Sequence, residues 1–383
     1  MKILILCATL DLSKPFGAIP YLWQLFKGFY EEGHEILIIP YHSHGIDTLW
    51  WRSVQNPNYY KGLFLEKMLK MFDYSASKTA NISFIPILAR LLVKPKLYKL
   101  INRILRQEKN IEAVLMIGIP LNQVEGLANQ IRHQHKIPII YYDLDVPSSL
   151  PSQGGFTFNY LRGVDLSEYD SIAVPSEGSV TELRKLGARH VNVVHFGVDP
   201  DVFNPIPFKK DIDFFFLGNS GRARAENLKM MITEPSKVLG NSFIVSGRGL
   251  NINLGRARVL HPLSLIEYRK CCCRAKVNLN IVRQLHADVY GTSTSRPFEL
   301  AAMQCCIVSA PYKGLEKWFD TNKEILVAKS SKECIEIYQM LLDDSDLRNS
   351  MGIAARNRLK KEHTTRHRAR QIIEILKEQK SFD

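Results

Sequence analysis

Lys2-Ile-Leu-Ile-Leu-Cys-Ala8 is an apolar run of strand length, and together with the residues that follow it decides the fold. Five large apolar residues then recur at helical spacing: Tyr21, Leu22, Leu25, Phe26 and Phe29. Gly33 ends this helical pattern, and residues 35–39 form the next run of strand length. Strand, helix and strand in this order predict a parallel sheet with helices packed against it.

The same alternation continues along the chain in two series. In the first, apolar runs lie at 113–118, 137–142, 171–175 and 191–195, with helical patterns such as 124–133 and 178–186 between them. The second begins at Asp211, with runs at 212–217, 242–246, 275–281, 307–310 and 324–328. Each series predicts a doubly wound α/β domain.

An irregular segment separates the two series. Residues 196–208 contain three prolines and one glycine, which excludes regular structure and places a linker at about 203–210. A length of 383 residues also favours two domains. We expect one domain at 1–204, a second at 205–365, and a terminal helix at 366–383. That helix carries an apolar stripe that must dock, and we expect it to pack back toward the first domain: Ala369, Ile372, Ile373 and Leu376.

Composition excludes several classes of protein. Hydrophobic residues make up 45% and charged residues 23%, so disordered and fibrous classes do not fit. The longest apolar stretches, 113–120 and 305–311, are well short of the roughly 20 residues that cross a bilayer. Five of the seven cysteines are clustered at 271–273 and 305–306, where neighbours cannot easily pair and the C-x₂₋₄-C spacing of zinc sites is missing. Reduced thiols in a cytoplasmic protein are therefore expected.

The net charge of +13 points toward a polyanionic partner, which can be nucleic acid, an anionic membrane surface or a phosphorylated substrate. Residues 61–109 carry eleven Lys or Arg against three acids. Nucleic acid is not expected, because this stretch lacks interleaved aromatic residues and no groove-reading motif is present. Two interpretations stay open: a basic amphipathic helix peripheral to the inner face of a membrane, or a solvated helical insertion in the first domain. The apolar stripe in question is Leu97, Ile101, Ile104 and Leu105.

The most informative motif is Val289-Tyr-Gly-Thr-Ser-Thr-Ser-Arg-Pro-Phe-Glu-Leu-Ala-Ala-Met303, which runs from a loop into a helix. Arg296 and Glu299 are three residues apart and project from one face of the first turn. A helix N-terminus beside an arginine suits a diphosphate, and a carboxylate one turn on can accept hydrogen bonds from both ribose hydroxyls. The alternative is that Glu299 only complements the helix dipole.

Three further segments can contribute to the same crevice. Phe214-Phe-Phe-Leu-Gly-Asn-Ser-Gly-Arg-Ala-Arg224 is a strand followed by glycines and two arginines, which suits close approach to a phosphate, although a tight turn explains it equally well. Arg248 follows another strand, and Asn280 lies on the strand before the Arg296 loop. The carboxyl ends of such strands meet at one edge of a parallel sheet. We therefore group Gly218, Arg224, Arg248, Asn280, Arg296 and Glu299 as candidate donor-binding residues.

In the first domain, Asp143 and Asp145 come just past a strand end. They can serve as a catalytic base or an acceptor ligand, can hold a divalent metal, or can merely cap the next turn. Gly17, His195 and Asp199 are candidates for the cleft between the domains, although His195 fits a structural hydrogen-bonding role equally well.

From Asp211 to about Lys377 the chain resembles the CgeB-like glycosyltransferases, relatives of the family 4 enzymes. The resemblance rests on motifs in the same order: Phe-Leu-Gly218, Leu-Asn-Ile281, Ser-Arg-Pro-Phe-Glu-Leu-Ala-Ala302, Gly-Leu-Glu-Lys-Trp-Phe319 and Glu-His-Thr-Thr-Arg-His-Arg368. It implies a GT-B fold, in which two Rossmann-like domains face each other across a cleft. The first domain would then bind the acceptor and the second the nucleotide-sugar.

The resemblance further implies Glu299 on the ribose, Arg296 or Arg224 near the diphosphate, and no bound metal or other cofactor. One position departs from the family 4 pattern: Gly291 stands where a second glutamate is usual, which leaves retention or inversion open. If the reaction inverts, Asp143 or Asp145 is the expected base. A nucleotide-sugar epimerase and a non-catalytic basic surface-binding protein are the alternative functions.

Overall fold

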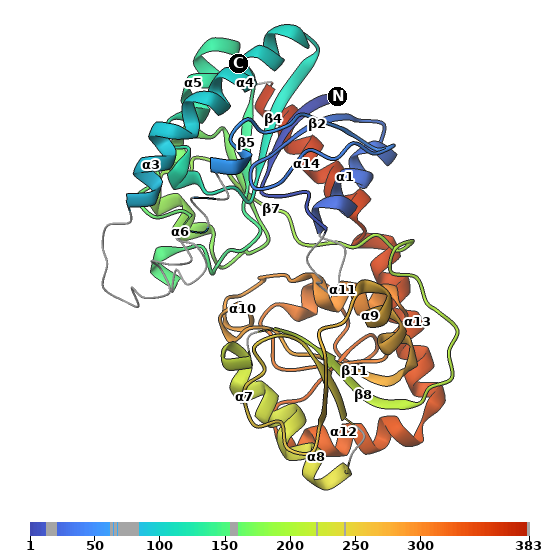
Figure 1. Ribbon diagram of the computed structural model, residues 1–383. Coiled ribbons are helices and arrows are strands. Elements are labelled where there is room, and N and C mark those ends of the chain that lie inside the picture. Colours follow the sequence, from blue (N-terminus) through green and yellow to red (C-terminus); the bar gives the residue numbers. More distant parts are fainter. Residues whose placement is uncertain are drawn as a thin grey trace. The chain divides into compact units, whose positions relative to one another are not determined.

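The computed structural model describes residues 1–12, 21–61, 64, 67, 84–153, 160–219, 221–240 and 243–380, so Gly17 lies outside the described residues. The chain forms two compact units (Figure 1). The first comprises residues 1–11, 26–194 and 369–383, and the second comprises 12–25 and 195–368. Each unit contains its own parallel sheet.

The sheet of the first unit has seven parallel strands in the order β3-β2-β1-β4-β5-β6-β7. Strand order reverses between β1 and β4, which confirms the predicted doubly wound arrangement. The strands are β1 (Lys2–Cys7), β2 (Glu35–Pro40), β3 (Arg52–Ser53), β4 (Ile111–Ile117), β5 (Ile139–Tyr142), β6 (Ser171–Val174) and β7 (Val191–Val193).

The sheet of the second unit has six parallel strands in the order β10-β9-β8-β11-β12-β13. Counted within the unit, this is the 3-2-1-4-5-6 order of the Rossmann fold, and its reversal lies between β8 and β11. Both predicted α/β series are thus doubly wound. The strands are β8 (Ile212–Leu217), β9 (Phe243–Ser246), β10 (Arg258–Leu260), β11 (Ala275–Asn280), β12 (Ile307–Ser309) and β13 (Leu326–Val327).

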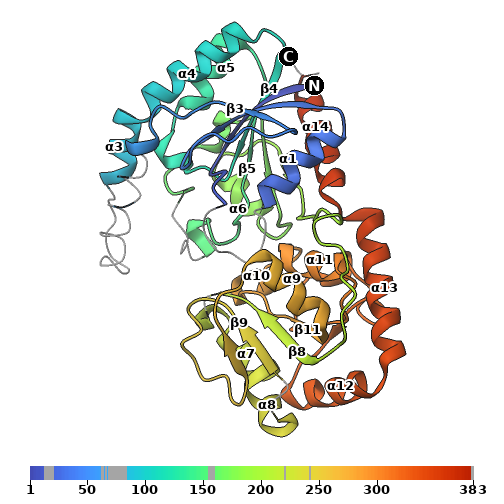
Figure 2. The same cartoon turned by 45° about the vertical axis from the view of Figure 1, so that its right-hand side comes forward.

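Helices pack against the first sheet, and alternate side chains of each strand point toward the same face. Leu4 and Leu6 of β1 pack into the core formed with α4 and α5, as expected for residues two apart on a strand. Helices α3, α4 and α5 follow this same side of the sheet (Figures 1 and 2). The helices are α1 (Tyr21–Glu31), α3 (Phe84–Leu92), α4 (Lys94–Gln107), α5 (Leu127–His135) and α6 (Val180–Lys185), with short 3₁₀ turns at Leu121–Gln123, Pro151–Gln153 and Leu166–Glu168.

The apolar stripe of α4 is part of this core. Leu97 and Ile101 are completely buried, and Ile104 and Leu105 are at most 8% exposed. From the sequence, two interpretations of this helix stayed open: it could lie on a membrane, or it could belong to a solvated helical insertion in the first domain. The structure places the stripe in the core of the first unit, so the stripe itself presents no apolar surface to a lipid.

The second sheet is likewise covered on both faces. Phe215 packs against α9 and α11, whereas Phe214 and Phe216 pack against the segment 225–239 and α12. The helices are α7 (Ala225–Leu228), a π-turn at Lys229–Thr233, α8 (Glu234–Leu239), α9 (Leu265–Arg274), α10 (Gln284–Asp288), α11 (Ser295–Ala302), α12 (Ser331–Asp343) and α13 (Ser345–Glu362), with 3₁₀ turns at Gly221–Arg224 and Leu315–Lys317. The last helix, α14 (Thr365–Lys380), belongs from residue 369 onward to the first unit.

The stripe of the last helix is buried, as its spacing predicts. Ala369, Ile372, Ile373 and Leu376 are at most 3% exposed, and Arg370 donates a hydrogen bond to Glu32 at 3.0 Å. All seven cysteines are buried and unbonded to one another. Within the described residues, no helix is both long and apolar enough to cross a membrane.

Candidate functional site

A cavity of about 220 Å³ lies at the carboxyl ends of β8 and β11. In a doubly wound sheet the strand order reverses between such strands, and ligands bind in the crevice that this reversal leaves open. Three arginines from three different segments reach this cavity, which makes it strongly basic. Its lining is Leu217, Gly218, Asn219, Arg224, Ile281, Val282, Arg283, Thr294, Ser295 and Arg296.

Arg224 is fixed in the cavity by the backbone around it. Its Nε donates to the carbonyl oxygen of Ile281 at 2.9 Å, and its guanidinium also bonds the carbonyl oxygen of Asn219. Burial, together with the positive charges of Arg283 and Arg296, lowers the pKa of Arg224 to about 10. Three guanidiniums thus lie close together in this cavity.

The guanidinium of Arg296 is held in place by Tyr268 and Glu299. Its guanidinium lies 4.5 Å from the ring centre of Tyr268 and forms an ion pair with Glu299 at 3.1 Å. The Tyr268 hydroxyl donates to Glu299 Oε2 at 3.1 Å. Glu299 is only 2% exposed and is not among the residues that line the cavity. The predicted pair therefore does share one helix face, with Arg296 at the cavity and Glu299 beside it.

The start of α11 adds backbone donors to this cavity. Thr294, the residue that precedes the helix, has an extended backbone and makes no side-chain capping hydrogen bond. The first amides of α11 therefore keep their hydrogen-bonding capacity next to Ser295 and Arg296, both of which line the cavity. Such an uncapped N-terminus favours an anion.

Arg283 is a cavity residue that the sequence analysis missed. It lies in the loop just after β11, and its Nη2 donates to Nε2 of His286 at 3.0 Å. Burial first, and then the positive charges of Arg283 and Arg224, lower the pKa of His286 to about 3, so its ring is neutral and can accept this bond. Its position in the sequence was the available signal, because Arg283 stands three residues after Asn280, at a strand end already expected to border the crevice.

The other predicted donor-binding residues lie near this cavity without lining it. Asn280 is completely buried on β11, and its amide donates to Ser309 Oγ at 2.9 Å. Arg248 is exposed after β9, and its backbone N–H donates to Asn219 Oδ1 at 2.7 Å. The structure thus brings Gly218, Arg224 and Arg296 together in one lining and leaves Arg248, Asn280 and Glu299 outside it.

Gly291 has a backbone that explains why no glutamate stands there. Its φ is +61°, in the left-handed region that favours glycine. Its N–H donates to the carbonyl oxygen of Lys313 at 3.1 Å, and a Cβ at Gly314 would lie 2.5 Å from Gly291 N. The two glycines therefore allow two backbone segments to meet closely. A side chain at position 291 would carry the strain of this conformation.

Asp143 makes the contacts of a residue that caps a turn. It is 2% exposed, its Oδ1 accepts hydrogen bonds from the backbone N–H groups of Asp145 (2.7 Å) and Val146 (2.9 Å), and Tyr141 donates to its Oδ2 at 3.3 Å. Burial raises the pKa of Asp143 to about 6. Asp145 is half-buried on the same turn. Of the interpretations left open for Asp143, turn capping is the one that these bonds display.

The stability of the chain should respond to the buried charge of Asp143. Between its ordinary pKa of 3.8 and the folded value of about 6, the folded chain keeps a proton that the unfolded chain has released. The free energy of unfolding therefore falls as pH rises through this window. Asp143→Asn keeps an acceptor oxygen for the turn and buries no charge. Relative to the wild type, the variant should gain about 2 kcal/mol between pH 4 and pH 8. Urea unfolding at both pH values measures this gain, and a stability difference that does not change with pH would contradict it.

His195 and Asp199, the remaining cleft candidates, both belong to the second unit. The His195 ring lies 5.2 Å from the Trp318 ring in an edge-on arrangement. Asp199 is 3% exposed, and its Oδ1 accepts a hydrogen bond from the backbone N–H of Asp201 at 2.9 Å. Both residues thus have packing or turn contacts within their own unit.

Comparison with known proteins gives a family match for part of the chain and a fold for the whole chain. A family model described as glycosyl transferase-like matches residues 226–374, and no curated protein matches the chain. Sucrose-phosphate synthase from Thermosynechococcus elongatus has a TM-score of 0.69 at 12% identity, with 100% of both chains covered. HepE from Anabaena in complex with UDP-glucose has a TM-score of 0.63 at 13% identity, with 99% of this chain and 100% of that chain covered. A glycosyltransferase from Rickettsia africae has a TM-score of 0.59 at 13% identity, with 98% of each chain covered.

At these identities the structural likeness shows the fold. The chain has the GT-B fold of two Rossmann-like domains, as the sequence predicted. The segment matched by the glycosyl transferase-like model, 226–374, contains Arg283, Arg296 and Glu299. The basic cavity therefore lies mostly within the part of the chain that resembles a known transferase family.

Proposed function

We propose that this chain is a glycosyltransferase that takes a sugar from a nucleoside diphosphate sugar, with the diphosphate bound in the basic cavity. The observation that carries the proposal is the convergence of Arg224, Arg283 and Arg296 at the β8/β11 reversal of a Rossmann unit. The match of residues 226–374 to a glycosyl transferase-like family supports it. HepE, which shares the fold, is described in complex with UDP-glucose, a donor of the same chemical class.

The charge of the cavity fits this ligand. Three guanidiniums and the carboxylate of Glu299 leave a net charge of two positive units, which balances the two negative charges of the diphosphate in a nucleotide-sugar. When the glycosidic bond breaks, the leaving diphosphate gains a further negative charge. Fixed guanidiniums and the first amides of α11 can stabilise that charge as it develops. We therefore propose that Arg296 and Arg224 act on the leaving group and that the reaction needs no divalent metal.

Glu299 has two possible partners in the bound state. In the structure it holds Arg296 and accepts a bond from Tyr268. We propose that a bound diphosphate draws Arg296 away and that the carboxylate then accepts hydrogen bonds from the ribose hydroxyls. The ordered motifs shared with CgeB-like enzymes support this assignment. On the acceptor side, we propose Asp143 or Asp145 as the base if the reaction inverts.

Incubation with UDP-glucose, UDP-N-acetylglucosamine, GDP-mannose and ADP-glucose in EDTA tests the proposed activity. At least one donor should raise the melting temperature while remaining intact and unisomerised, because a transferase without its acceptor holds the donor and does not convert it. An isomerised sugar, or free diphosphate released at a steady rate, would identify an epimerase or a hydrolase. Stabilisation by none of the four would favour a non-catalytic binding protein.

A further inference from the structure

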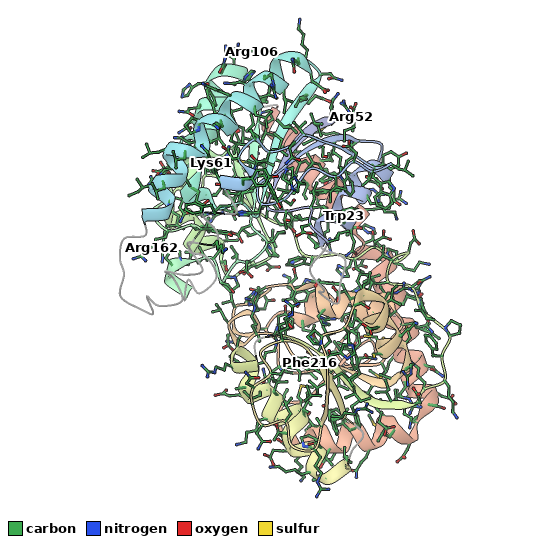
Figure 3. The ribbon with its side chains drawn as sticks, viewed as in Figure 1. Trp23, Arg52, Lys61, Arg106, Arg162 and Phe216 are labelled. Atoms are coloured by element: carbon green, nitrogen blue, oxygen red, sulfur yellow. The ribbon has the colours of Figure 1, made fainter. Side chains whose placement is uncertain are left out.

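The solvent face of α4 carries a stripe of basic side chains. Lys96, Lys99, Arg103 and Arg106 follow one another at intervals of three and four residues, which places them on one face of the helix. All four are exposed, whereas the apolar residues between them are buried in the core. The stripe extends for about 15 Å along the helix axis. Figure 3 labels Arg106, at the end of this stripe.

The four charges are not compensated within the described part of the chain. None of them takes part in an ion pair there, although other basic residues of the same unit do: Lys2 pairs with Glu35 at 2.8 Å and Arg132 with Asp170 at 2.9 Å. Glu108, the acid that follows α4, is already bound by Lys2 and Arg52. Like charges at these intervals destabilise a helix. An uncompensated stripe therefore needs an explanation outside the stability of the fold.

An apolar ridge precedes the stripe. Ile87, Leu91 and Leu92 on α3 are 42%, 67% and 47% exposed. Ile87 and Leu91 are four residues apart and therefore neighbours on one face of α3. The buried Val93 alone separates α3 from α4, and the two helices contact each other. The ridge and the basic stripe thus belong to consecutive helices that pack together (Figure 2).

We propose that α3 and α4 form a docking surface for an anionic lipid bilayer, with the basic stripe at the phosphate headgroups and the ridge inserted among the first acyl carbons. Charge complementarity favours an anionic surface, and the exposed aliphatic side chains select lipid over nucleic acid. Nucleic acid would contact the stripe but would gain nothing from leucine and isoleucine side chains that reach no base. A bilayer binds both features, because its anionic headgroups attract the basic side chains and its acyl chains take up the apolar ones. The proposal does not depend on the proposed transferase activity.

Flotation of the full chain with vesicles tests this surface. At low salt the chain should float with vesicles of phosphatidylglycerol and phosphatidylcholine and should stay at the bottom with phosphatidylcholine alone. The triple variant Lys96→Gln, Lys99→Gln, Arg103→Gln should lose partitioning by about 100-fold, because each basic residue near an anionic surface contributes about fivefold. The variant Leu91→Gln, Leu92→Gln should lose the part of the binding that survives in high salt.

A charge-matched control separates this face from net charge. The variant Lys323→Gln, Lys329→Gln, Lys360→Gln removes three exposed basic residues of the second unit, and its partitioning should fall at most a few-fold. All substituted residues are exposed, so unchanged circular dichroism spectra are expected, and no melting temperature should fall. Equal losses in the two triple variants would overturn the proposal, as would a wild type that never floats at low salt. Retention on DNA-cellulose without flotation would assign the stripe to nucleic acid instead.

Discussion

Replacing Arg296 with methionine should weaken the binding of a nucleoside diphosphate by about 10- to 100-fold, the loss expected for a charged hydrogen-bonding partner. Methionine keeps apolar volume over the Tyr268 ring but removes the guanidinium that faces the cavity. Transfer of the sugar should fall at least as much, because the leaving diphosphate loses a fixed positive charge just as its own charge grows. Calorimetric titration and initial rates measure the two effects.

Arg258→Met is the matched control for this substitution. Arg258 is an exposed arginine of the same unit that does not line the cavity, so its loss should leave affinity nearly unchanged. Glu299→Gln distinguishes the two roles proposed for the carboxylate, which are to hold Arg296 and to bind the ribose. If Glu299 binds the ribose, the wild type should discriminate against a 2′,3′-dideoxynucleotide and the variant should not. If Arg296→Met and the wild type bound the diphosphate with equal affinity, Arg296 would not be a diphosphate-binding residue.

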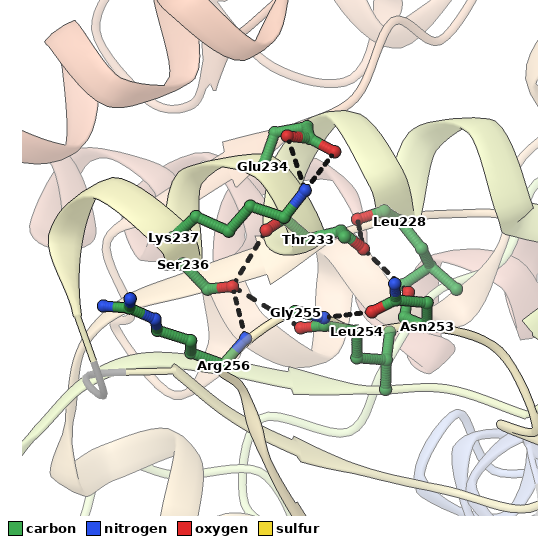
Figure 4. Close-up of polar contacts among 9 residues, drawn as sticks. All are labelled: Leu228, Thr233, Glu234, Ser236, Lys237, Asn253, Leu254, Gly255 and Arg256. Carbon is green, nitrogen blue, oxygen red and sulfur yellow. Dashed lines mark hydrogen bonds and ion pairs between the residues drawn. The ribbon is translucent and has the colours of Figure 1, made fainter.

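Gly255→Ala should be the most destabilising single substitution that we predict in the second unit. Gly255 has a φ of +65°, and an added Cβ would lie 2.4 Å from Ser236 Oγ and 2.5 Å from the Thr233 carbonyl oxygen. Ser236 cannot easily yield, because its hydroxyl donates to Thr233 O and accepts from Arg256 N, both at 2.9 Å (Figure 4). Backbone strain and overpacking together should cost about 2 to 4 kcal/mol.

Gly33→Ala isolates the backbone contribution. Gly33 has a similar φ of +77°, but nothing lies within 4 Å of an added Cβ, so only the strain of the left-handed conformation remains, about 1 kcal/mol. Comparing the urea midpoints of the two variants therefore measures the clash alone. If both variants lost the same free energy of unfolding, Ser236 and the loop at 253–256 would accommodate the added Cβ without an energetic cost.

The fold was predictable because hydrophobic periodicity marks buried strands. β1 and β8, for example, were predicted almost to the residue. The pattern missed β3 and β10, which have two and three residues, lie at the edges of their sheets and have partly exposed side chains. An edge strand this short carries no continuous buried run. Its existence depends on pairing with a neighbour, which a one-dimensional pattern does not contain.

The candidate site was predictable in part, for a similar reason. The rule that strand ends converge at one edge of the sheet correctly grouped Gly218, Arg224 and Arg296. It did not reveal that Asn280 is buried against Ser309 or that Arg283 enters the cavity, because side-chain direction depends on packing. The same limit applies to α4. Its spacing identified an amphipathic helix, but only the packed structure shows that the apolar face is occupied by the core.

Calorimetric titration in EDTA with UDP, GDP and ADP, each compared with its monophosphate, tests the central claim most directly. The account predicts that at least one diphosphate binds without metal and at least 100-fold more tightly than the matching monophosphate, since each additional charged contact contributes about 1.5 to 3 kcal/mol. Equal affinity for diphosphate and monophosphate, or binding that appears only when Mg²⁺ is added, would contradict a cavity built from three arginines to hold a diphosphate.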